Sequence, residues 1–240
     1  MLYDYLTKHY AVNEPIFLSD IHLPDITNNY LRQMFKQLCD SGKLKRFHAG
    51  VYYLTSSDSS FPSAPLSART VAEHKYIQNG TDISGYYLGQ SFAAQLNLCP
   101  APINLLEIVT NHTSGKYREI YLDDVKIILR KPKFQVTNDN WKTLQFLDFL
   151  KDIELYADVK SDSTKEKIQN YILENQITKE TISPYISEYP DKIYRMVYDL
   201  ELYDALKESY GNFFVSIQPK GTSLKPNPAK QRRGLSIELL

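Results

Sequence analysis

The sequence predicts an α+β protein with an N-terminal winged helix-turn-helix, a small mixed α/β middle module and a helical C-terminal part. Three observations lead to this prediction. Residues 27–53 combine an amphipathic helix, a glycine and a two-stranded hairpin. Residues 69–129 mix helical and strand patterns, whereas the chain from residue 138 onward has helical patterns alone. These changes of pattern divide the chain into three expected domains, residues 1–60, 61–137 and 138–240.

The first expected domain begins with a helix over residues 1–10 and a short extended piece. Ser19 or Asp20 is expected to cap a brief second helix, which Pro24 ends because proline disfavours helical backbone in the residue before it. At the other end of this domain, the polar, proline-bearing residues 56–65 have the composition of a linker. We therefore expect few contacts to cross it, and the flanking units to behave independently.

The helix expected after Thr27, its N-cap, has two different faces. Hydrophobic residues recur at helical spacing on one of them: Leu31, Met34, Phe35 and Leu38. The opposite face carries amides and cations: Asn29, Gln33 and Lys36, with Arg32 and Gln37 beside them. Amide side chains read base edges and cations bind phosphates, so this face is typical of a helix that enters the major groove of DNA. A polar outer face is also the ordinary exterior of any surface helix.

A basic hairpin follows this helix and forms the expected wing. Residues 27–50 contain five cations and one acid, although the formal net charge of the whole chain is zero. Such a local basic patch is the electrostatic footprint of a nucleic-acid-binding surface. Because Leu44 and Phe47 are three residues apart, strict strand alternation fails, and the direction of each wing cation stays open. The residues expected to contact DNA are Asn28, Asn29, Arg32, Gln33, Lys36, Lys43, Lys45, Arg46 and His48.

The composition limits the class of protein. A chain of 240 residues with 42% hydrophobic and 23% charged residues is ordinary for a globular protein of one or two domains. Formal neutrality argues against a protein that coats nucleic acid without selectivity, but not against a local binding patch. No apolar run approaches the roughly 20 residues of a membrane span, and no signal-peptide pattern is present. We expect a cytoplasmic protein without a membrane partner, in which Cys39 and Cys99 are free thiols without a zinc pattern.

The later elements are expected from periodicity and turn residues. The middle module would contain two helices and a hairpin that turns at Asp123-Asp124, its elements spanning residues 69–78, 83–87, 89–98, 105–110, 118–122 and 125–129. Four helices would follow, near residues 138–156, 164–175, 178–187 and 190–209. Tyr86, Tyr87, Gln90 and Lys116 are expected as exposed features of the middle module. The basic tail at 218–234 could contact a nucleic-acid backbone or simply be solvated.

Two stretches of the chain resemble the AbiEi-type antitoxins of type IV (abortive-infection) toxin–antitoxin systems and related antitoxin-like transcriptional regulators. The first, residues 41–52, is similar to the helix end and wing of that family. The second extends through residues 83–89 and 93–98 to the strand Glu107–Thr110. The resemblance implies a repressor that binds inverted repeats in the promoter of its own operon. It also implies an antitoxin that counters a nucleotidyltransferase-like toxin without a stable complex.

The sequence carries no catalytic signature: no Walker A loop, GxSxG, HExxH or GxGxxG motif. The five histidines (His9, His22, His48, His74 and His112) lack ligand spacing, so no metal and no cofactor are expected. Two alternatives stay open. Glu107, Asp124 and Lys126 follow the acid, acid-x-lysine order of metal-dependent nucleases, and a winged helix can also serve as a protein-interaction scaffold.

Overall fold

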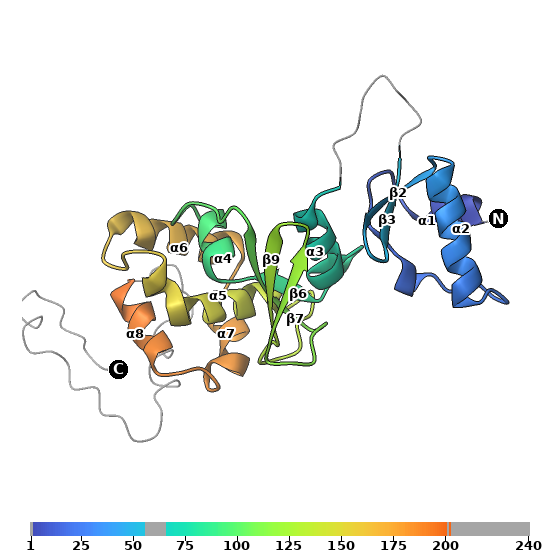
Figure 1. The fold of residues 1–240 in the computed structure, drawn as a ribbon. Helices are drawn as coiled ribbons and strands as arrows, with labels where there is room; N and C mark the ends of the chain where they lie inside the picture. The colour runs from blue at the N-terminus through green and yellow to red at the C-terminus, as the bar shows by residue number, and fades with distance from the viewer. Residues whose placement is uncertain (1, 56–65, 201, 203–240) are drawn as a thin grey trace, which may run out of the picture.

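The computed structural model describes residues 2–55, 66–200 and 202. These residues form a mixed α+β architecture with eight α-helices and three sheets (Figure 1). The expected linker at 56–65 and the basic tail at 218–234 lie outside this part of the chain. None of the helices in the described residues is both long enough and apolar enough to cross a membrane.

The N-terminal region contains three helical segments and a small antiparallel sheet. Its elements are α1 (Leu2–His9), β1 (Ile16–Phe17), η1 (Leu18–Asp20), α2 (Asn28–Asp40), β2 (Leu44–His48) and β3 (Val51–Leu54). The strand order is β1-β3-β2, so the strand that precedes α2 pairs with the last strand of the hairpin. A separate hydrophobic core fills this region, and its buried residues are Leu2, Leu6, Ile16, Ile21, Leu31, Phe35, Leu44 and Leu54.

The prediction for α2 is confirmed at both ends. The Thr27 side chain accepts a hydrogen bond from the Tyr30 backbone N–H at 3.3 Å, which satisfies one of the free donors of the first turn. At the other end, Gly42 has a φ of +74° and the Lys43 N–H donates to the Leu38 carbonyl oxygen at 3.0 Å. This geometry is a Schellman-type termination, for which glycine is favoured because it carries no Cβ.

The brief second helix expected before α2 is reduced to the single 3₁₀ turn η1. Ser19 and Asp20 lie inside this turn and hydrogen bond to one another, so neither caps a following helix. Ile21, which follows η1, has extended backbone and a buried side chain. The chain between η1 and α2 therefore packs as an extended segment, because burying Ile21 in the small core takes the place of a further helical turn.

The hairpin contains a β-bulge that settles the direction of its side chains. Arg46 pairs with Tyr52, whereas His48 pairs with Val51, so Phe47 is an extra residue in β2. The expected failure of alternation is therefore real. Leu44 packs in the N-terminal core, whereas Phe47 packs against the larger core of the molecule.

The middle of the chain forms a four-stranded sheet with order β6-β7-β9-β8, in which β7 and β9 are parallel and the other pairs are antiparallel. Figure 1 shows this sheet between α3 on one side and α4 and α5 on the other. A small hairpin of two short strands, β4 and β5, precedes it. The elements are α3 (Ala68–Tyr76), β4 (Gln78–Asn79), β5 (Asp82–Ile83), β6 (Gly85–Tyr87), α4 (Gly89–Gln95), β7 (Leu105–Thr110), β8 (Tyr117–Leu122) and β9 (Val125–Arg130).

The expected exposure of Tyr86 and Tyr87 is wrong: their exposed fractions are 1% and 7%. The Tyr86 hydroxyl donates to Asp148 at 2.7 Å, and the Tyr87 hydroxyl donates to Glu73 at 2.6 Å. These partners lie on α5 and α3, the helices that cover opposite faces of the sheet. The two tyrosines are therefore core residues whose hydroxyls find polar partners. Gln90 is half-buried and Lys116 is exposed.

The C-terminal part is helical in the described residues, as expected. Its elements are α5 (Trp141–Asp152), η2 (Ile153–Leu155), α6 (Asp162–Glu174), α7 (Lys179–Ile186) and α8 (Lys192–Asp199). Every residue of α5 from Thr143 to Leu150 is buried. This helix is the centre of the larger core, because it packs on the sheet and is covered by the later helices.

In the described residues few contacts link the first domain to the middle module, as expected, and they are gathered in one small patch. Phe17 of β1, together with Val51 and Tyr53 of β3, belongs to the larger core rather than to the N-terminal one. The Phe17 ring lies 5.9 Å from the His74 ring of α3, and His74 Nε2 lies 3.4 Å from Glu14 Oε1. A few side chains on one face of the small sheet thus contact the middle module.

Candidate nucleic-acid interface

The outer face of α2 presents the predicted polar side chains to solvent. Asn28, Asn29, Arg32, Gln33 and Lys36 are all exposed. The Arg32 guanidinium donates to the Asn29 side-chain oxygen at 3.2 Å, so these two side chains are held together one turn apart. Gln33 and Lys36 have no such intramolecular partner in the described structure. The helix therefore offers both amide and cationic groups to an external ligand.

The cations of the β2–β3 hairpin separate into two sets by its register. Arg46 pairs with Tyr52, whose ring centroid lies 4.8 Å from that of Phe35, so Arg46 shares its face of the hairpin with α2. Lys45 pairs with Tyr53, which belongs to the larger core, and therefore projects from the opposite face. His48, opposite Val51, follows Lys45 to that second face. Sequence reasoning could not assign these directions.

Lys43 completes the predicted set from the end of α2. Its ammonium lies 4.7 Å from the centre of the Tyr3 ring of α1, a cation–π contact at the edge of the N-terminal region. The Arg46 side chain is oriented by a hydrogen bond from its Nε to the His48 carbonyl oxygen at 3.3 Å. The surface around α2 thus has Arg32, Lys36 and Arg46 on one side, with Asp40 the single acid between residues 27 and 50.

The nuclease-like order of Glu107, Asp124 and Lys126 does not become a site. The backbone register sets Glu107 opposite Ile128, two residues beyond Lys126 on β9. Lys126 forms an ion pair with Glu119 at 2.8 Å, and Asp124 accepts a hydrogen bond from Asn104 at 3.0 Å in the hairpin turn. The three groups therefore have separate partners, and no observation favours metal-assisted hydrolysis at this place.

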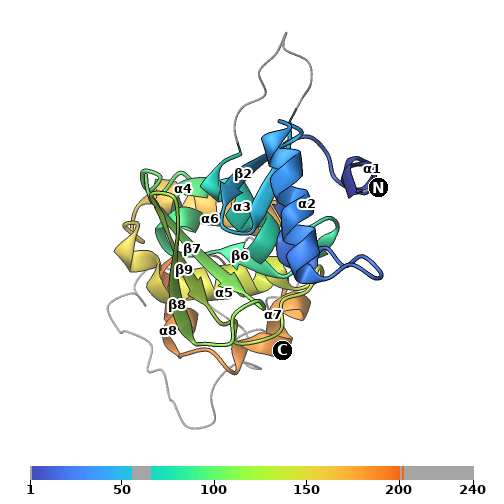
Figure 2. The same ribbon diagram turned by 45° about the vertical axis from the view of Figure 1, so that its right-hand side comes forward.

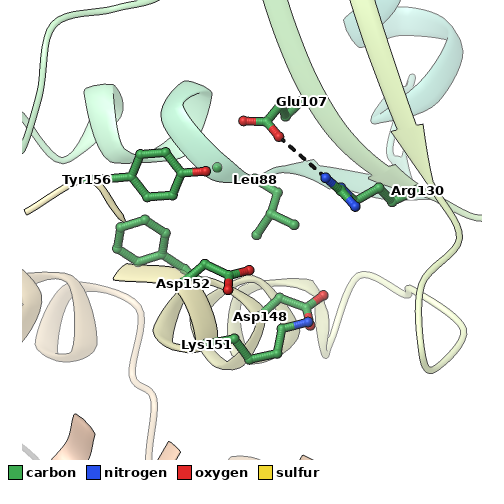
Figure 3. Close-up of a pocket in the computed structure, with 9 residues that line it drawn as sticks. Leu88, Glu107, Arg130, Asp148, Lys151, Asp152 and Tyr156 are labelled. Carbon is green, nitrogen blue, oxygen red and sulfur yellow. Dashed lines mark ion pairs between the residues drawn. The ribbon is translucent and has the colours of Figure 1, made fainter. Parts of the chain in front are cut away.

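A charged cavity that the sequence did not predict lies between the sheet and α5. Its volume is about 100 Å³. Figure 3 shows Glu107 and Arg130 entering from the sheet, Asp148, Lys151 and Asp152 from α5, and Tyr156 from the segment after η2. Leu88, Gly89 and Phe149 complete the lining. The signal that could have predicted it is a charged residue inside an apolar run, as at Glu107 within the strand Leu105–Thr110.

The charges of this cavity are largely paired with one another. Glu107 lies 3.8 Å from Arg130 and accepts a hydrogen bond from the Gln90 backbone N–H at 3.0 Å. Asp148 pairs with Lys151 at 2.8 Å. Such pairing explains how carboxylates are tolerated near the core, since an unpaired buried charge is costly. These charged groups therefore serve mainly a structural role where the sheet meets α5.

No group of histidine, cysteine or acidic side chains in the described residues is arranged to hold a metal ion. Of the five histidines, His74 is the one with an acidic partner, Glu14, and it lies at the interface with the N-terminal region rather than in the cavity. The two cysteines, Cys39 and Cys99, are free and half-buried. Burial raises the pKa of both thiols, so neither is activated as a thiolate.

No protein-family model matches the chain, and a search of curated proteins gives no significant relative. These comparisons therefore assign no family to the chain, and its function has to be argued from its own residues and topology.

Proposed function

We propose that the chain is a DNA-binding antitoxin and transcriptional autorepressor of a type IV toxin–antitoxin operon. In this proposal the N-terminal region is a winged helix-turn-helix that binds an inverted-repeat operator in double-stranded DNA. The rest of the chain counters a nucleotidyltransferase-like toxin, without a stable complex. The protein acts in the cytoplasm, where its operator and its toxin would be found.

The observation that carries the DNA-binding part is the order and pairing of the N-terminal elements. The elements follow in the order helix (α1), short strand (β1), helical turn (η1), longer helix (α2) and hairpin (β2–β3). The first strand, β1, pairs with the last, β3. This order supports the proposal of a winged helix, in which α2 would be the recognition helix and β2–β3 the wing. The apolar face of α2 packs in the small core, and its opposite face is polar, exposed and basic.

The chemistry of α2 supports contact with both bases and phosphates. Gln33 and Asn29, one turn apart, are able to form bidentate contacts with adenine in the major groove. Arg32 and Lys36 lie on either side of Gln33 in the sequence and would bind phosphates. Arg46 extends the cationic surface onto the wing, because it shares the α2 side of the hairpin.

The antitoxin part of the proposal is supported by sequence resemblance and not by the geometry of α2. This support comes from the resemblance of residues 41–52 and 83–110 to AbiEi-type antitoxins, and the fold contributes an α+β middle module without a catalytic arrangement. No specific observation favours the nuclease or the interaction scaffold over this function.

The experiment is a binding assay on the DNA upstream of the gene, with the full chain at about 150 mM salt. Arg32→Ala/Lys36→Ala should weaken binding strongly, because phosphate contacts contribute most of the affinity. Lys160→Ala/Lys179→Ala removes the same charge far from α2 and should bind like the wild type. Equal binding by wild type and the α2 variant would refute the DNA-binding assignment, and failure to protect cells from the cognate toxin would refute the antitoxin role.

A further inference from the structure

The β8–β9 hairpin exposes one face of the main sheet that the proposed function does not use. We call it the tyrosine face and define it by five residues: Tyr117, Glu119 and Tyr121 of β8, and Lys126 and Arg130 of β9. β8 is the edge strand of the sheet, beside β9, as Figure 2 shows. The tyrosine face lies on the side of the sheet that α5 covers nearer its middle, where Glu107 and Arg130 line the cavity. Tyr117 is 49% exposed and Tyr121 is 60% exposed, whereas Tyr86 and Tyr87, the tyrosines of β6, are buried.

The strand register places these side chains on one surface. Tyr117 is opposite Arg130 and Tyr121 is opposite Lys126, and residues directly opposite in an antiparallel pair share a face. The two rings are four residues apart, or about 14 Å along the strand. Each ring therefore has a cation as its cross-strand neighbour. The same face continues across β9 to Glu107, since Ile128 is opposite both Glu119 and Glu107.

Polar contacts hold this face in a defined arrangement. The Arg130 guanidinium lies 5.5 Å from the centre of the Tyr117 ring, and the Tyr117 hydroxyl donates to Glu119. Lys126 forms a hydrogen-bonded ion pair with Glu119 at 2.8 Å, which lowers the pKa of that carboxyl and neutralises its charge. The single acid of the tyrosine face is thus compensated, and its contacts fix the position of one ring.

The surroundings of the tyrosine face are basic. Residues 116–133 contain six cations and three acids. Lys116 and Lys131 flank the pair of Tyr117 and Arg130, and a hydrogen bond from the Lys131 N–H to the Lys116 carbonyl oxygen at 3.3 Å holds their backbones side by side. Two of the acids, Asp123 and Asp124, lie in the turn at the other end of the hairpin. Positive charge is therefore concentrated around Tyr117.

We propose that the tyrosine face binds single-stranded nucleic acid, with unpaired bases stacked on Tyr117 and Tyr121 and the backbone phosphates near Lys116, Arg130 and Lys131. Exposed aromatic rings on a sheet, bordered by cations, are the arrangement by which proteins bind single strands. A duplex does not suit it, because paired bases have no free face for stacking. A docked protein suits it less, because charged side chains separate the two rings, and Ile128, the apolar residue on the same face, is half-buried.

This inference goes beyond the proposed function, since it concerns a different surface and a different form of nucleic acid. Its test needs neither operator DNA nor toxin. The full chain is titrated into fluorescein-labelled oligothymidine and oligouridine of about ten nucleotides, and anisotropy is recorded. We expect both to bind, and their ratio tells whether DNA or RNA is preferred.

Two variants of the tyrosine face give the central comparison. Tyr117→Ala/Tyr121→Ala should weaken single-strand binding by about tenfold or more, because each stacked base contributes appreciably to affinity. Tyr117→Phe/Tyr121→Phe keeps both rings and should stay within about threefold of wild type. Both positions are exposed, so the fold should tolerate the changes, which circular dichroism verifies.

A third variant tests whether single strands bind instead to the basic surface around α2. Arg32→Ala/Lys36→Ala/Arg46→Ala removes the cations around α2 and should leave single-strand binding in place. The proposal is wrong if the alanine double variant of the tyrosine face binds single strands as wild type does. It is equally wrong if the α2 variant alone loses single-strand binding. It is also wrong if no oligonucleotide binds while a protein partner proves to require Tyr117 and Tyr121.

Discussion

Lys45 and Arg46 are consecutive in β2 but project from opposite faces of the hairpin. Arg46 is opposite Tyr52, which packs on Phe35 of α2, whereas Lys45 is opposite Tyr53, which is buried toward the middle module. Two cations that look equivalent in the sequence therefore have different neighbours. Only Arg46 can reach a ligand that also lies along α2.

The first prediction follows from this difference. If Arg32, Lys36 and Arg46 bind phosphates, the slope of log affinity for the operator against log salt should be about −2.7, from about −0.9 per phosphate. Arg46→Ala should reduce its magnitude by about 0.9, while Lys45→Ala, the same charge change one residue away, should leave it near the wild-type value. A larger effect from Lys45→Ala would mean that the wing meets DNA through its other face.

A second prediction separates base reading from phosphate binding. Gln33→Ala should relax base preference at one or two operator positions, because a bidentate amide–adenine pair contributes about 1–3 kcal/mol of discrimination. Lys36→Ala, one turn away, should weaken all sequences alike. Selection from a randomised operator library measures both profiles. An unchanged profile for the Gln33 variant would exclude a role for this amide in sequence readout.

A third prediction concerns the glycine that borders the cavity. A Cβ at Gly89 would lie 1.9 Å from Glu107 Oε2, and Gly89 has a φ of +59°. Gly80 has the same φ of +59° but nothing within 4 Å of its Cβ position. Gly80→Ala should therefore cost only the backbone strain, about 1–2 kcal/mol of unfolding free energy. Gly89→Ala should cost clearly more, measured by urea denaturation; equal costs would show that the Glu107 side chain simply moves away.

A fourth prediction concerns alkaline pH. Burial, reinforced by Asp148 and Glu73 respectively, raises the pKa of Tyr86 and Tyr87 well above the usual value near 10. The folded state then holds these protons more tightly than the unfolded state, so their contribution to stability is complete below about pH 10 and is lost above it. Tyr87→Phe should make the fall of the urea midpoint above pH 10 less steep. Tyr30→Phe, at an exposed position, should not change it.

Local signals in the sequence were sufficient for most of the elements. The Thr27 cap, the glycine at 42 and the Asp123-Asp124 turn each act through neighbouring backbone, so they can be read without the fold. Burial could not be read in this way. Tyr86 and Tyr87 look like exposed aromatic residues until α3 and α5 are placed on the two faces of the sheet.

The candidate nucleic-acid interface was likewise predictable only where local signals determine it. Exposure of the polar α2 residues follows from helical periodicity, whereas the directions of Lys45 and Arg46 depend on which residues of β3 lie opposite them, a register that the sequence alone does not give. The cavity around Glu107 joins residues from β7, β9 and α5 that are far apart in the chain. Only tertiary packing brings them together.

The last prediction concerns the joint between the N-terminal region and the middle module. Phe17 is 5% exposed and packs with α3, and the Lys75 ammonium lies 5.2 Å from the centre of its ring. Replacing a buried phenylalanine by alanine typically costs about 3–5 kcal/mol. Because the two regions share this core, Phe17→Ala should destabilise both, and not the N-terminal region alone.

Trp141 of α5 reports on the second region, since it is the single tryptophan of the chain. We expect Phe17→Ala to lower the urea midpoint of Trp141 fluorescence, with circular dichroism following the same transition. Tyr30→Ala, on the exposed face of α2, should leave that midpoint unchanged. A normal Trp141 transition in the Phe17 variant, together with an early separate loss of helix signal, would mean that the two regions unfold independently. In that case the interface seen at Phe17 would contribute little to stability, and removal of the first 60 residues would leave a folded remainder.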